Sequence, residues 1–165
     1  MQQEKGEIMS TLRKYIIVFF ISMVPLIELR GAIPVAIDGY HLPVIASFII
    51  CIIGNMLPVP IIYLFAHKVL IWGLKVPVFC GFCRFCLKKG KKAGEKLVEK
   101  AGRGTFIALC LFVGIPLPGT GAWTGTLGAS ILGLSFKETV AACMCGVILA
   151  GCIMMFVSYG AQIIF

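Results

Sequence analysis

The chain has 165 residues, of which 59% are hydrophobic and 13% charged, and its mean hydropathy is +1.01. Soluble domains contain about a quarter charged residues, so this composition excludes a soluble protein and predicts a single membrane domain over residues 1–165, with about four to six membrane elements. Eight basic and two acidic residues between Arg84 and Arg103 carry most of the net charge of +8, and the apolar segments on both sides favour a cytoplasmic loop over nucleic-acid binding.

The first apolar segment, residues 15–27, follows a polar stretch of 14 residues. A helix needs about 20 residues to cross the hydrocarbon core, so this segment is too short to span. It predicts the first arm of a hairpin that enters and leaves the membrane on the same side. A cleaved signal peptide is the alternative, but Leu29 and Arg30 occupy the positions where small residues would precede cleavage.

Glu28 and Arg30 follow this arm and are the only charged residues between positions 15 and 37. Charges at membrane depth cost several kcal/mol unless they find partners or water, so such residues indicate a functional site. Two prolines and a glycine nearby predict that the backbone of residues 28–34 is not a plain helix. Arg30 is suited to bind a phosphate or carboxylate, and Glu28 either holds Arg30 or exchanges a proton. The alternative is an internal ion pair that only pins the hairpin.

A long apolar stretch, residues 42–74, comes next and predicts a membrane-spanning helix. Pro58 and Pro60 predict a kink within it. Asp38, just before this stretch, is interpreted as interfacial, with a cavity carboxylate as the alternative. Asn55 is a weaker candidate for a side chain that faces a cavity beside the kink.

The polar connector, residues 75–103, predicts a short amphipathic helix on the membrane surface. Four lysines are the predicted contacts with anionic lipid headgroups: Lys88, Lys89, Lys91 and Lys92.

Three cysteines in this connector, Cys80, Cys83 and Cys86, form two overlapping C-x-x-C spacings of the kind that bind zinc or iron–sulfur clusters. No fourth ligand is evident nearby, and phenylalanines alternate with the thiols. The interpretation is therefore an interfacial aromatic segment with reduced thiols, with neither a metal nor a cofactor.

The second half opens with another short apolar arm, residues 105–113, and a second break, GIPLPGTG, at residues 114–121. Prolines there remove backbone donors, while hydroxyls and an indole N–H supply polar groups in a region without charge. The candidate site residues of this half are Pro116, Pro118, Thr120, Trp123 and Thr124. A further arm, residues 122–134, and a long apolar segment, residues 138–165, complete the chain.

The two halves follow the same pattern. Val24-Pro25-Leu26 matches Ile115-Pro116-Leu117 at an offset of 91 residues, and Gly54 matches Gly146 at an offset of 92. A hairpin adds no membrane crossing and a long helix adds one, so the second half starts on the opposite face. The prediction is an all-α integral membrane protein with two inverted repeats, about 13–74 and 104–165, each a broken re-entrant hairpin plus a long transmembrane helix.

The motifs ELRGAIP (Glu28–Pro34) and GIPLPGTGAWTG (Gly114–Gly125) resemble those of the bacterial small multidrug export family, and the likeness runs from about Arg13 to the end of the chain. A more distant similarity is to the DedA superfamily. The first resemblance implies a drug exporter. The second implies inverted re-entrant hairpins, with Glu28 as the acid of the first, and movement of lipid phosphates such as undecaprenyl phosphate. DedA proteins also carry arginines in and after the second hairpin, whereas residues 104–136 contain no charge, so Arg30 is the one obvious anion ligand.

Three functions follow as hypotheses. The first is a small secondary transporter in the bacterial inner membrane that exports or flips an amphipathic or anionic substrate by alternating access, with Glu28 as a proton-coupling group. The second is a lipid-phosphate translocase, and the third is a non-transporting structural or assembly protein. No arrangement of nucleophile, histidine and acid predicts an enzyme. A chain of two small repeats is also suited to form a homodimer.

Overall fold

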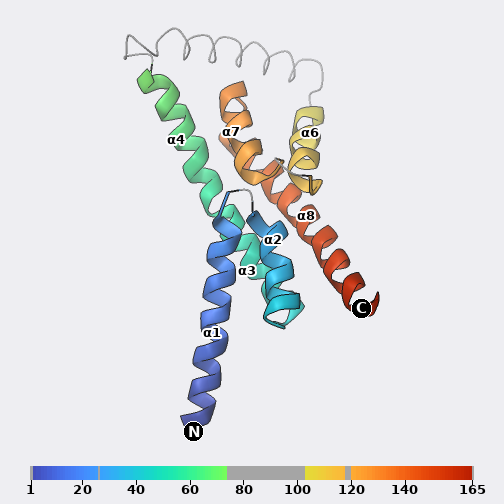
Figure 1. Ribbon diagram of the computed structural model, residues 1–165. Helices are drawn as coiled ribbons and strands as arrows, with labels where there is room; N and C mark the ends of the chain where they lie inside the picture. Colours follow the sequence, from blue (N-terminus) through green and yellow to red (C-terminus); the bar gives the residue numbers. More distant parts are fainter. Residues whose placement is uncertain (1, 26, 74–102, 118–119, 165) are drawn as a thin grey trace.

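The computed structural model describes residues 2–25, 27–73, 103–117 and 120–164, and every regular element in these parts is helical (Figure 1). The elements are α1 (Gln2–Met23), α2 (Glu28–Pro34), the π-helical turn η1 (Val35–Gly39), α3 (Val44–Met56), α4 (Pro58–Gly73), α6 (Arg103–Gly114), α7 (Ala122–Leu132) and α8 (Phe136–Ile164). The all-α prediction is confirmed for these residues. The predicted surface helix, its four lysines, the three C-x-x-C cysteines and Pro118 lie outside the described residues.

Two stretches of the described residues are long and apolar enough to cross a membrane. One is Val44–Ala66, which comprises α3 and most of α4, and the other is Phe136–Gly160 within α8. Their 23 and 25 residues exceed the roughly 20 that a spanning helix needs. The helix path bends at Leu57, because Pro58 and Pro60 cannot donate to the preceding turn.

The remaining helices are arranged as two pairs that turn back on themselves (Figure 1). In the figure, α1 rises from the N-terminus to the middle of the molecule and α2 returns downward, while α6 descends to the middle and α7 returns upward. The two turns lie beside each other. The helices α3 and α4 run upward past this point, and α8 runs downward and packs against α2, α3 and α6.

The first break does not lie where the sequence predicted it. The prediction of an irregular backbone at residues 28–34 is wrong: this run forms α2, and the break occupies residues 24–27. Pro25 ends α1 because it has no N–H to donate. Pro34 is tolerated because the helix widens into η1, where the Tyr40 N–H reaches the Val35 carbonyl oxygen at 3.0 Å. The second break agrees with its prediction, since α6 ends at Gly114 and α7 begins at Ala122.

Two glycines allow pairs of helices to pack with their backbones in close contact: Gly54 of α3 lies against α1, and Gly146 of α8 lies against α6. A Cβ atom at Gly54 would lie 2.7 Å from the carbonyl oxygen of Phe19 in α1. A Cβ atom at Gly146 would lie 2.7 Å from the carbonyl oxygen of Cys110 in α6. Backbone atoms cannot move aside as flexible side chains can, so both positions require glycine.

We therefore expect Gly54→Ala and Gly146→Ala each to destabilise the protein by about 1–3 kcal/mol through overpacking. Gly128→Ala is the matched control, because a Cβ atom there meets nothing within 4 Å and alanine is favoured in helices. Thermal denaturation of the detergent-solubilised variants measures the difference. Equal melting temperatures for the three variants would contradict the close packing.

Candidate functional site

The side chain of Arg30 reaches from α2 across to the second break. Its Nη1 donates to the carbonyl oxygens of Leu117 and Thr120. Its Nη2 lies 3.1 Å from each of three acceptors, the carbonyl oxygens of Val113 and Ile115 and the Oγ1 of Thr120. The last carbonyls of a helix have no donors within it and carry the negative end of the helix dipole. The guanidinium therefore caps the C-terminus of α6.

The carboxylate of Glu28 meets the other end of the same break. Its Oε1 accepts a hydrogen bond of 3.2 Å from the backbone N–H of Trp123, and the carboxylate also interacts with the N–H of Ala122. These amides belong to the first turn of α7, where unpaired N–H groups give the helix a positive end. The N-cap residue, Gly121, has no side chain that could accept hydrogen bonds from these N–H groups. Glu28, which is 5% exposed, is the anion that caps α7.

Gly121 makes room for that carboxylate. A Cβ atom at this position would overlap both carboxylate oxygens of Glu28. The residue also has a φ of 152°, which side chains of L-residues rarely adopt. Glycine is therefore required here both for space and for backbone conformation. The residue lay inside the predicted break, but only its contact with Glu28 identifies it as part of the site.

Glu28 and Arg30 are not paired with each other, although only one residue separates them. Each binds a different helix end of the second hairpin, and the positive φ of Glu28, 51°, starts α2 in an orientation that permits this. We call this arrangement, formed by Glu28, Arg30, residues 113–117 and residues 120–123, the charged junction. It joins two segments that lie 83 to 95 residues apart in the chain.

The donors of Arg30 are largely used within the charged junction. Both Nη atoms are bound to oxygens of the second break, and the buried Nε has no partner among the described residues. A phosphate or carboxylate would have to displace these carbonyls to reach the guanidinium. The role of Arg30 as an anion ligand stays a prediction.

The structure brings some of the other predicted residues to the junction and leaves others apart. Thr120 belongs to it through its hydroxyl and carbonyl oxygens, and Pro116 lies within the same break. The Thr124 hydroxyl donates to the Gly121 carbonyl oxygen at 3.4 Å. Asp38 is exposed in η1, at the end of the hairpin away from the break. Asn55 is fully buried in α3, and neither atom of its amide has a hydrogen-bond partner in the described parts of the chain.

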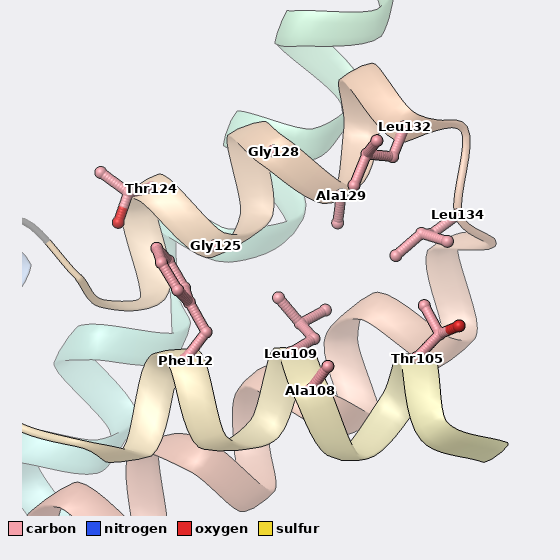
Figure 2. Close-up of a pocket in the computed structure, with 10 residues that line it drawn as sticks. All are labelled: Thr105, Ala108, Leu109, Phe112, Thr124, Gly125, Gly128, Ala129, Leu132 and Leu134. Carbon is pink, nitrogen blue, oxygen red and sulfur yellow. The ribbon is translucent and has the colours of Figure 1, made fainter. Parts of the chain in front are cut away.

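Two cavities flank α7. One, of about 250 Å³, lies between α6 and α7, where Leu109 and Phe112 face Gly125 and Ala129 (Figure 2). The other, of about 480 Å³, lies between α4 and α7 and extends to Pro25 in the first break. We call them the α6–α7 cavity and the α4–α7 cavity. Neither is lined by a charged residue among those described.

Comparison with known families gives one result. The family model described as "putative small multi-drug export protein" matches residues 28–153, more than half of the chain and all of the charged junction. Neither the curated proteins nor the solved structures yield a match.

Proposed function

Because the chain belongs to the small multi-drug export protein family, we propose that it is a secondary transporter that exports amphipathic compounds across the bacterial inner membrane. The charged junction is the point where its two halves meet and separate during transport. Glu28 is the group that couples this movement to a proton.

The helix boundaries support two repeats of one architecture. The first arms end at Met23 and Gly114, 91 residues apart, and the long helices begin at Val44 and Phe136, 92 residues apart. These are the offsets of the sequence match. The contacts of Gly54 and Gly146 repeat as well, since Phe19 and Cys110 are also 91 residues apart.

The opposed directions of the two pairs favour inverted repeats (Figure 1). In this proposal α1–α2 and α6–α7 are re-entrant hairpins that enter from opposite leaflets, as in transporters whose broken helices form a site near the midplane. Non-helical backbone is tolerated at that depth where protein covers it, and Arg30 and Glu28 provide such cover. The positive-inside rule puts the basic connector on the cytoplasmic side.

The position of the Glu28 carboxylate is the observation that carries the proposal. It is a buried acid on the first hairpin, and its hydrogen-bond donor, the Trp123 N–H, belongs to the second hairpin. A protonated carboxyl group loses its charge interaction with the helix end and becomes a weaker acceptor. Protonation therefore loosens α7 from α2, and deprotonation restores the contact. Arg30 and Cys143 are the other titratable groups whose electrostatic interaction with Glu28 is resolved.

Transport in proteoliposomes with an imposed pH gradient tests this role. We expect Glu28→Gln to abolish proton-driven transport of an amphipathic dye, because the amide keeps the shape of the side chain and cannot exchange the proton. Glu28→Asp is expected to retain part of the activity. Glu138→Gln is the matched control, since Glu138 is an exposed acid at the start of α8.

Two outcomes would contradict the proposal. Wild-type transport by Glu28→Gln would exclude proton coupling through this residue. Absence of transport by the wild-type protein, with Glu28→Gln and Arg30→Ala both silent in cells at matched expression, would favour a structural or assembly role.

Lipid-phosphate translocation requires a phosphate to replace the carbonyls bound to Arg30, and it predicts that Arg30→Ala blocks lipid-carrier recycling without changing drug resistance.

A further inference from the structure

We propose that the α4–α7 cavity binds the exported compound, and that this compound is an uncharged aromatic molecule. This inference rests on the proposed function and names the substrate class of the same site. The cavity lies between two helices and touches Pro25 at the tip of the first hairpin. Its α4 wall consists of Ile62, Phe65 and Ala66, and its α7 wall of Trp123, Thr124, Leu127 and Ile131.

The surface of the cavity determines the chemical class. No polar atom of the described residues contributes to it, and no lining residue is ionisable. A charged group placed there would lose its hydration without gaining a partner, which costs several kcal/mol. An apolar compound gains about 25 cal/mol for each Å² of apolar surface removed from water. The rings of Phe65 and Trp123 add favourable geometry for an aromatic ligand.

The size and position of the cavity fit a compound that enters from the hydrocarbon core. Its volume of about 480 Å³ falls within the range of about 300–1,000 Å³ that small-molecule sites occupy. Phe65 is 67% exposed and Leu127 is 45% exposed, so the outer wall of the cavity faces the lipid. Lipophilic compounds partition into that region and therefore reach the cavity laterally.

Trp123 links this cavity to the proton site. Its side chain lines the cavity, while its backbone N–H donates to the carboxylate of Glu28. A ligand that pushes on the indole therefore acts on the residue that holds the junction closed. An ordinary lipid-facing groove has no such connection. This contact with the charged junction is the reason to assign the cavity to a transported compound rather than to a lipid acyl chain.

The chain offers a direct reporter for the test. It contains two tryptophans, Trp72 and Trp123, and Trp72 is 64% exposed and does not line the cavity. In Trp72→Phe protein, reconstituted in lipid nanodiscs, the fluorescence therefore comes from Trp123. We expect N-phenyl-1-naphthylamine, an uncharged aromatic probe, to quench this emission saturably by energy transfer. A permanently cationic aromatic dye is expected not to compete.

A cavity-filling variant establishes the location. Ala66→Leu, in the Trp72→Phe background, is expected to weaken probe binding by at least about tenfold, because it occupies the volume of the ligand. Ala141→Leu is the matched control, since Ala141 is exposed on α8 and makes no part of the cavity. Ile131→Phe fills the cavity from the opposite wall and is expected to act like Ala66→Leu, which protects the test against a folding defect in one variant.

The outcomes separate this inference from the proposed function. Quenching that rises linearly with probe and is the same in all variants indicates partition into lipid only and overturns the inference. Saturable binding that survives both cavity-filling variants, or that a cationic dye displaces, also overturns it. Loss of binding in both, with Ala141→Leu unchanged, supports it even if Glu28→Gln leaves transport intact and the coupling proposal fails.

Discussion

Replacement of Arg30 by methionine is expected to destabilise the protein by about 1–3 kcal/mol, because the hydrogen bonds of a half-buried guanidinium are lost. Methionine preserves the apolar stem but leaves the acceptors of the second break without their donor. In the proposed arrangement of re-entrant hairpins these carbonyl groups lie at membrane depth, where bulk water does not replace a lost donor. Removing the guanidinium also takes away the positive charge that faces Glu28. The expected result is a loss of thermal stability.

Thermal denaturation of the purified protein, followed by size-exclusion chromatography, measures this loss. Arg13→Met is the matched control, because Arg13 is exposed in α1 and exposed charges contribute little to stability. Arg30→Lys is expected to fall between the two, since an ammonium keeps the charge but has three donors in place of the planar fork. A melting temperature for Arg30→Met equal to that of Arg13→Met would show that the cap on α6 is not structural.

Substitution of Gly121 by alanine is expected to abolish proton-driven transport and to lower stability by about 1–3 kcal/mol. The new methyl group would occupy the place of the Glu28 carboxylate, and the φ of 152° would become strained. The carboxylate must then leave the N-terminus of α7. The Glu28 side chain itself is unchanged in this variant. A loss of transport would therefore show that the position of the carboxylate is required, and not only its presence.

The pH dependence of transport distinguishes this effect from simple misfolding. If the junction is the coupling site, Gly121→Ala that still inserts will resemble Glu28→Gln and will show no response to the proton gradient. Gly128→Ala is about two helical turns further along α7. A Cβ atom there meets nothing within 4 Å, so this variant is expected to transport like the wild type. Proton-driven transport by Gly121→Ala at the wild-type rate would contradict the role assigned to Glu28 at the N-terminus of α7.

Much of the fold could be predicted from the sequence, because the length of an apolar stretch determines whether it can form a long membrane helix. The stretches at 42–74 and 138–165 predicted the long helices, and the observed bounds of α3, α4 and α8 differ from these by a few residues. The second break could also be predicted from the local sequence, since proline and glycine recur through residues 114–121. The resemblance to the small multidrug export family, stated from two motifs, is confirmed by the family match.

The first break shows where local signals fail. The run at 28–34 contains a glycine and a proline, yet its backbone stays helical because η1 accommodates Pro34. The partners of Glu28 and Arg30 could not be predicted at all. Nothing in a local motif specifies that two neighbouring charges will bind opposite ends of one break about 90 residues away. That choice depends on tertiary packing, which places α2 beside the second hairpin.

Because one acid and one guanidinium cap the two ends of a single interruption, the charged junction is electrically neutral in its closed form. A neutral assembly experiences no net force from the voltage across the membrane. Once Glu28 takes up a proton, the same assembly carries one positive charge, and displacement through the full voltage is worth about 2.3 kcal/mol per 100 mV. In the proposed cycle the membrane potential therefore acts on the charged junction in its protonated form and not in its neutral form, which would give transport a direction.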